Sequence, residues 1–307
     1  VPDDLVLGLG VAAPGPIDPE AGRVIHPPLM QSWGDVPLRD RVADATGIPT
    51  LLEKDVAAAM VAELWQGNHA SAGTTLFVYL GFGIGFAFAR DGEVLSGSSR
   101  NAGEIGHLIV DADGPACFCG NRGCLGVSVS LEHLVGEAVA AGVLPATVAR
   151  TTPAELDLAM GLLAEAARRE GRDGDGVGGI SDGPSDSDAA LAASGSGAHD
   201  AATTTAAAEI LDRAARRLAR GIVIVSDLID ADSVVVGGAN WERFRPHLTV
   251  AARAEFAGHA TMRELHGVEV GGAALGPWIG AVGAASRVLD AAFTPHASLL
   301  VAQPATA

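Results

Sequence analysis

The sequence predicts an α/β fold, because short apolar segments typical of strands alternate with longer segments typical of helices. The three clearest strand-like segments are 5–11, 48–53 and 233–238, each rich in Val, Leu or Ile. Glycine or proline residues bound the helix-like segments between them. No internal repeat of fixed period runs through the chain.

The first third of the chain begins with a buried strand that runs into a turn at Pro14-Gly15-Pro16. A short helix is expected over 36–47, where Gly47 ends it because glycine readily takes the left-handed conformation of a helix C-cap. The next expected elements are a strand at 48–53 and an Ala-rich helix from Asp55 to about Gln66, closed by Gly67. The segments 75–80 and 85–89 predict a strand hairpin, with a turn at Asp91-Gly92.

The remaining elements continue the same alternation. Helices are expected at 131–141, 153–170 and 204–219, the last continuing through 221–228, followed by strands at 233–238 and 268–270 and a closing helix at 276–291. Residues 171–200 are Gly, Ser, Asp and Ala with almost nothing large and apolar, which predicts a disordered insert.

Composition excludes several classes of protein. The 20 basic and 37 acidic side chains leave a formal charge of −17, and such a chain repels a phosphate backbone, so it is not expected to bind DNA unaided. No apolar run reaches the ~20 residues of a bilayer-spanning helix, and the first residues have no secretory signal pattern. We therefore expect a cytoplasmic protein with no membrane partner.

The strongest local signal is a group of potential metal ligands. His107, Cys117, Cys119 and Cys124 have the spacing His-x9-Cys-x-Cys-x4-Cys, and Gly120 and Gly123 allow a tight reversal between the cysteines. Three thiolates and one imidazole are a tetrahedral zinc set with no open position, which predicts a structural zinc ion. These are the only cysteines of the chain. Three ordinary core thiols and a surface His are the weaker alternative, since all four residues lie within eighteen positions. A disulfide would leave one odd thiol in a reducing compartment.

These residues and their neighbours resemble the ROK family of repressors, open reading frames and sugar kinases. The family's zinc and sugar-site motif is similar to Gly103-Glu104-Ile105-Gly106-His107 followed by 117–125. Other similar segments are 10–18, 33–39, 80–85, 234–238 and 280–286.

The resemblance implies a two-lobed actin-like ATPase fold that binds a sugar between its lobes. It places a partial N-terminal lobe at 1–70, a C-terminal lobe with the zinc loop at 71–280, a helix returning to the first lobe at 281–294 and a tail at 295–307. It makes Asp55 the general base, and Glu104 and His107 sugar ligands beside Asp55. It also implies nucleotide contacts at Gly81, Gly83, Gly85, Gly237 and Gly238, and a homodimer.

Several departures from the family pattern occur at positions that the resemblance assigns to catalysis or to sugar and phosphate binding. Lys54 stands where the family has Asn, and its positive charge is expected to lower the pKa of Asp55. Gly126 replaces a further acidic sugar ligand. Phe82 and Phe86 stand in the glycine turn, where they either fill a nucleotide cleft or point into the core. The kinases' Asp-x-Gly-Gly-Thr phosphate motif has no counterpart in residues 1–307.

Three functions are therefore considered. The leading one is the sugar-sensing and dimerising part of a ROK transcriptional regulator, without kinase activity, whose DNA-binding domain lies outside residues 1–307. The alternative is an ATP- and magnesium-dependent sugar kinase of glucokinase type, for which Asp55 and the glycines 81, 83 and 85 argue. The third is a degenerate fragment. Of the other histidines, His133 among them, none has a second ligand at metal spacing, and they are assigned no role.

Overall fold

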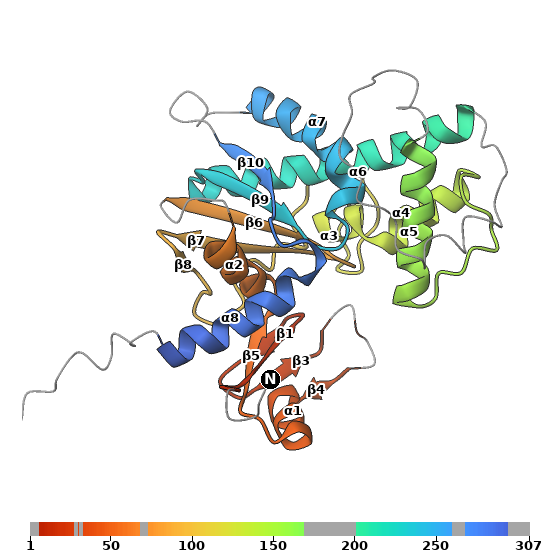
Figure 1. Ribbon diagram of the computed structural model, residues 1–307. Helices are drawn as coiled ribbons and strands as arrows, with labels where there is room; N and C mark the ends of the chain where they lie inside the picture. Colours follow the sequence, from red (N-terminus) through yellow and green to blue (C-terminus); the bar gives the residue numbers. More distant parts are fainter. Residues whose placement is uncertain are drawn as a thin grey trace, which may run out of the picture. The chain divides into compact units, whose positions relative to one another are not determined.

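The computed structural model describes residues 6–27, 30, 33–67, 73–168, 201–259 and 268–293 (Figure 1). The expected insert at 171–200 and the tail at 295–307 lie outside these residues. The chain divides into a first unit, made of Val1–Leu108, Ile222–Glu242 and Phe256–Ala307, and a second unit, made of Ile109–Gly221 and Arg243–Glu255. The sequence-based lobe boundaries at 70 and 280 stay a prediction.

The first unit contains a two-stranded parallel sheet near its N-terminus. Strand β1 (Leu9–Ala13) pairs with β5 (Thr50–Lys54), and Leu9 lies opposite Thr50. Helix α1 (Leu38–Thr46) precedes β5 and ends at Gly47, whose φ of 69° confirms the expected left-handed cap. A small antiparallel sheet of β2 (Ile17–Asp18), β3 (Arg23–Ile25) and β4 (Asp35–Val36) lies between β1 and α1 in the chain.

The larger sheet of the first unit has the strand order β10-β9-β6-β7-β8. Its members are β6 (Thr74–Leu80), β7 (Ile84–Arg90), β8 (Glu93–Val94), β9 (Ser233–Gly237) and β10 (Glu269–Gly272). Strands β6 and β7 form the expected hairpin, but residues 81–83 connect them. The turn at Asp91-Gly92 instead connects β7 to β8, where φ values of 49° and 81° provide the positive dihedrals of a tight hairpin turn.

Helices α2 (Asp55–Gln66) and α8 (Ile279–Phe293) lie side by side in the first unit (Figure 1). Every residue of α2 from Val56 to Glu63 is buried, which explains why this helix has no polar face. The contact with α8 is close because a Cβ built on Gly283 would lie 1.7 Å from the carbonyl oxygen of Ala58. Helix α8, which follows a 3-10 turn at Gly276–Trp278, confirms the expected closing helix.

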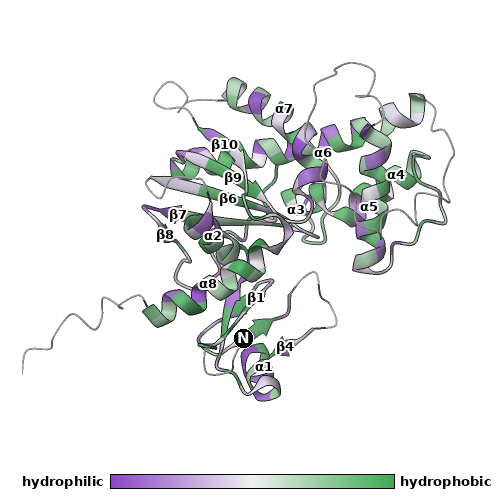
Figure 2. Ribbon diagram, viewed as in Figure 1, coloured by the Kyte–Doolittle hydropathy of each residue, from purple (hydrophilic) through white to green (hydrophobic). Residues whose placement is uncertain are grey.

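The second unit is helical. It contains α3 (Leu125–Val129), α4 (Leu131–Ala140) and α5 (Pro153–Arg168), and α4 packs against α5. Helices α6 (Ala201–Ile229) and α7 (Trp241–His259) each contribute to both units. Figure 2 shows hydrophobic and hydrophilic residues alternating along α6, the pattern of an amphipathic helix. In the described part of the chain, no helix is both long and apolar enough to cross a membrane.

The α2–α8 contact gives a test of the packing. We expect Gly283→Ala to lower the free energy of unfolding by about 2 kcal/mol, because its methyl group meets the backbone of α2. The matched control is Gly280→Ala on the same helix, whose Cβ would approach only the Ala12 side chain, at 4.0 Å. This control should raise stability by about 0.5 kcal/mol through helix propensity. Urea unfolding followed by circular dichroism measures both, and equal effects would contradict the close contact.

Candidate functional site

Asp55 is the first residue of α2 and directly follows β5. Its Oδ1 accepts a hydrogen bond from the backbone N–H of Val56 at 2.8 Å. Burial raises the pKa of Asp55 from 3.8 to about 6, while the Val56 N–H and the Lys54 charge lower it and Glu104 raises it further. The expected effect of Lys54 is confirmed in direction, since its charge lowers the pKa of Asp55, but the loss of water around the carboxyl outweighs it and the net shift is upward.

Lys54 and Glu104 form an ion pair beside Asp55. The distance from Lys54 Nζ to Glu104 Oε1 is 2.8 Å, and the exposed fractions of the two side chains are 4% and 55%. The same ammonium also donates to the backbone carbonyls of Asn101 and Ala102, each at 3.3 Å. Glu104, predicted as a sugar ligand, is thus held at the end of β5.

The loop that carries Glu104 is fixed by Asn101, a residue that the sequence analysis did not single out. Its Oδ1 accepts from the N–H of Ile17 and its Nδ2 donates to the carbonyl of Ile17, both at 2.8 Å. The same Nδ2 also donates to the carbonyl of Ser99 two residues earlier, but the pairing with distant Ile17 leaves no local sequence pattern. Only the folded chain therefore identifies this role.

The predicted glycine turn lies at the amino end of α2. A Cβ built on Gly85 would lie 2.2 Å from Cγ1 of Val56, so glycine is needed for this close approach. Gly81 and Gly83 form the turn itself, with a hydrogen bond from the N–H of Gly81 to the carbonyl of Gly83 at 2.9 Å. The two phenylalanines have different surroundings: Phe86 is fully buried in the core, whereas the Phe82 side chain is 47% exposed.

The second glycine segment meets the first. Gly238 has a φ of 100°, and a Cβ built on it would lie 2.5 Å from the carbonyl oxygen of Leu80. Asn240, which is 2% exposed, donates from Nδ2 to the carbonyl of Gly81 at 2.8 Å. Gly237 and Gly238 therefore lie next to the 81–83 turn, as the prediction of one nucleotide site requires. Asn240, which joins them, was missed because a single Asn after a strand has no distinguishing pattern.

The four predicted metal ligands come together. One ligand atom from each of His107, Cys117, Cys119 and Cys124 lies within 4.8 Å of all the others. Burial and the neighbouring sulfurs raise the pKa of the Cys124 thiol to about 12. A bound divalent cation reverses this cost because it stabilises the thiolates. Soft sulfur donors with one imidazole fit zinc in number and chemistry.

Arginines of α6 hold the segment that leads into the cysteine loop. Arg217 Nε lies 2.8 Å from Asp111 Oδ2, and this hydrogen bond lowers the pKa of Asp111. Arg220 donates from Nη1 to the carbonyl of Val110 at 2.9 Å. A Cβ on Gly123, whose φ is 68°, would lie 1.5 Å from the carbonyl of Asp111, so the two sides of the loop are in contact.

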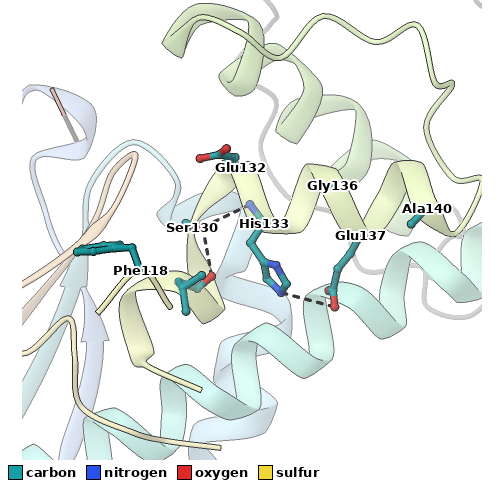
Figure 3. Close-up of a pocket in the computed structure, with 8 residues that line it drawn as sticks. Phe118, Ser130, Glu132, His133, Gly136, Glu137 and Ala140 are labelled. Atoms are coloured by element: carbon teal, nitrogen blue, oxygen red, sulfur yellow. Dashed lines mark hydrogen bonds and ion pairs between the residues drawn. The ribbon is translucent and has the colours of Figure 1, made fainter. Parts of the chain in front are cut away.

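A shallow hollow of about 610 Å³ lies along α3 and α4 in the second unit (Figure 3). Its lining includes Phe118, which is 82% exposed and follows Cys117 in the chain, and His133 with Glu137. The distance from His133 Nε2 to Glu137 Oε1 is 3.6 Å, and burial is the main cause that lowers the pKa of His133. None of the residues predicted from the sequence to bind sugar, nucleotide or metal lines this hollow.

The sequence and fold of the chain were compared with those of known proteins. The model of the ROK family matches residues 2–144. This segment is therefore similar to the ROK family. Regulators and kinases are both among the similar proteins. A xylose repressor of Caldicellulosiruptor bescii is 32% identical over 120 residues, which are 39% of this chain and 30% of the repressor. A glucokinase of Thermotoga maritima is 38% identical over 117 residues, 38% of this chain and 37% of the enzyme.

The chain thus spans well under half of the length of these two ROK relatives. Its fold extends the likeness further. The crystal structure of a ROK glucokinase from Streptomyces griseus, in complex with glucose and AMPPNP, has a TM-score of 0.67 with this chain at 24% sequence identity, covering 91% of this chain and 80% of that one. The α/β architecture is therefore the actin-like ATPase fold of the ROK sugar kinases, as the resemblance implied.

Metal content gives a test of the cluster. We expect the purified chain to bind one zinc ion, and His107→Asn to weaken zinc binding at least about tenfold, because it removes one of four ligands. His26→Asn, at a residue outside the cluster, is the matched control. Elemental analysis and competition with a chromophoric chelator measure stoichiometry and affinity. Equal zinc affinities for the two variants would remove His107 from the site.

The raised pKa of Asp55 predicts a pH-dependent stability. The protonated carboxyl favours the folded chain, so this stabilisation is fully present below pH 3.8 and is lost as the pH rises through about 6. Asn cannot ionise, and we expect Asp55→Asn to be more stable than wild type by up to about 3 kcal/mol at pH 8. The difference should become small at pH 4. Urea unfolding at the two pH values tests this, and a difference independent of pH would show that burial does not raise the pKa.

Proposed function

We propose that this chain is the sugar-binding effector part of a ROK-family transcriptional regulator and does not transfer phosphate. The observation that carries the proposal is the ion pair between Lys54 and Glu104 next to Asp55. A cation replaces the neutral amide expected at position 54 from the family resemblance and binds the carboxylate of a predicted sugar ligand. The site keeps Asp55 and Glu104 together but changes the charge around the predicted base.

In this proposal Asp55, Glu104 and His107 bind hydroxyl groups of the sugar, and a structural zinc ion holds His107 with the three cysteines. Binding favours one arrangement of the ROK fold over another and so shifts the state of a DNA-binding domain outside residues 1–307. The regulator acts as a cytoplasmic homodimer. DNA is contacted only through that further domain, because the present chain carries a charge of −17.

An ATP- and magnesium-dependent sugar kinase is the second candidate. A carboxyl with a pKa of about 6 suits a general base near neutral pH. In that reaction Asp55 takes the proton of a sugar hydroxyl, whose oxygen forms a bond to the γ-phosphorus of ATP as the bond to ADP breaks. The glycines 81, 83, 85, 237 and 238 give the backbone N–H groups for the nucleotide phosphates.

Sugar binding and ADP release distinguish the two candidates. The protein, expressed from its complete reading frame and loaded with zinc, is titrated with hexoses, N-acetylhexosamines and pentoses and then assayed with ATP and magnesium. We expect binding of a sugar without sugar-dependent ADP release. Turnover that Asp55→Asn abolishes would establish the kinase instead. Folded, zinc-loaded protein that binds no sugar and releases no ADP would contradict both candidates.

A further inference from the structure

Lys54 is the only lysine of the chain and one of its most buried charged residues, 3% exposed. Burying an ammonium group is costly unless each N–H finds an acceptor. Here the three acceptors are Oε1 of Glu104 at 2.8 Å and the carbonyls of Asn101 and Ala102 at 3.3 Å. An ammonium has three donors, so Lys54 has none left for a ligand.

All three acceptors belong to one short loop, residues 101–104. The loop also contacts the segment after β1: a Cβ built on Gly15 would lie 3.0 Å from Oε1 of Glu104 and 3.3 Å from Cε of Lys54. The end of β5, the segment around Gly15 and the 101–104 loop therefore meet at the Lys54 side chain. Glu104 remains 55% exposed on its open side.

The two oxygens of the Glu104 carboxylate differ in their surroundings. Oε1 lies 2.8 Å from the ammonium nitrogen of Lys54, whereas no described residue forms a hydrogen bond with Oε2. A half-exposed carboxylate with one oxygen fixed can accept a hydroxyl group at the other with little further loss of conformational freedom.

We propose that Lys54 is a positioning residue, which fixes Glu104 through Oε1 so that Oε2 is presented to one hydroxyl group of an uncharged sugar. The ligand half of this inference rests on the proposed function. The charge balance selects against anionic ligands: Lys54 neutralises Glu104 but offers no free donor, and Asp55 adds negative charge at neutral pH. Sugar acids and sugar phosphates are therefore disfavoured relative to neutral sugars.

The test removes the ammonium while keeping the length of the side chain, in Lys54→Met. Its control is Arg287→Met. Arg287 Nε lies 3.0 Å from Oε2 of Glu53, the residue before Lys54 in β5, so this variant also removes a cation from an ion pair at the end of that strand. Each variant removes the cation from an ion pair that has one buried member, Lys54 in the first pair and Glu53 in the second. Only Lys54→Met is expected to loosen the 101–104 loop.

Amide hydrogen exchange is the readout that does not need a ligand. We expect the amides of 101–104 to exchange at least about tenfold faster in Lys54→Met than in wild type, and Arg287→Met to leave their rates unchanged. Glu104→Gln, at a half-exposed position, is the second variant should Lys54→Met not fold, and it should loosen the same amides. Unchanged exchange at 101–104 in both variants would overturn the proposal.

Calorimetric titration with D-glucose, D-xylose and D-glucuronate tests the ligand half. We expect a neutral sugar to bind, glucuronate to bind at least about tenfold more weakly, and Lys54→Met to lose at least about tenfold in affinity for the neutral sugar while Arg287→Met does not. The double variant Lys54→Met/Glu104→Gln should lose no more than Glu104→Gln alone, because the two residues act as one unit. Loss of loop order in Lys54→Met without sugar binding by wild type would contradict the proposed function and leave the positioning role intact.

A spectroscopic signature separates positioning from mere structural support. The charge of Lys54 lowers the pKa of Asp55, and Glu104 raises it; Tyr79 is a further titratable group that interacts with Asp55. Removing Lys54 should therefore move the carboxyl titration of Asp55 above about 6 in carbon-13 NMR. Arg287→Met should leave it in place. An unshifted Asp55 in Lys54→Met would show that the ammonium does not act on this site.

Discussion

The carboxyl end of β5 connects the parts of the first unit through three consecutive charged residues. Glu53 accepts from Arg287 of α8, Lys54 bonds to the loop of Glu104, and Asp55 begins α2. Adjacent residues of a strand point to opposite sides, so one short segment reaches two separate partners. Charges buried in this way are stable only when their partners are in place. The loop, the helix and the strand therefore depend on one another, and the candidate sugar site lies where they meet.

Burial also determines how Asp55 titrates. A carboxyl that loses water holds its proton more strongly, so Asp55 titrates closer to neutral pH than an exposed aspartate. The ionised, buried Asp55 lowers the free energy of unfolding, and such a cost in stability is common at functional sites. The cysteine loop uses a different device: tight glycine turns and an arginine of α6 bring three sulfurs together, and a cation offsets the cost of gathering them.

Regulators and kinases of the ROK family share this framework, and the likeness to both extends to a xylose repressor and a glucokinase at similar identity. Because the same fold occurs in regulators and in kinases, a choice between the two functions has to rest on local chemistry and not on architecture. Gly126 lies in α3, where it brings no carboxylate to the site, and Phe82 stands exposed in the glycine turn. Both differences concern single side chains, and the fold alone does not assign the activity.

The sequence by itself determined the elements whose signals are local. The α2 and α1 boundaries follow from Asp55, Gly47 and Gly67, and the metal cluster follows from four ligands within eighteen residues.

Tertiary structure alone decided the rest. The hairpin turn at 81–83 was misplaced because Asp91-Gly92 has equally good turn chemistry. The distant partners of Lys54, Asn101 and Asn240 lie between 47 and 159 residues away in the chain, and the pKa of Asp55 depends on how much water the packed side chains exclude. Local sequence patterns predict neither long-range pairing nor the dielectric environment of a side chain, because both exist only after the chain has folded.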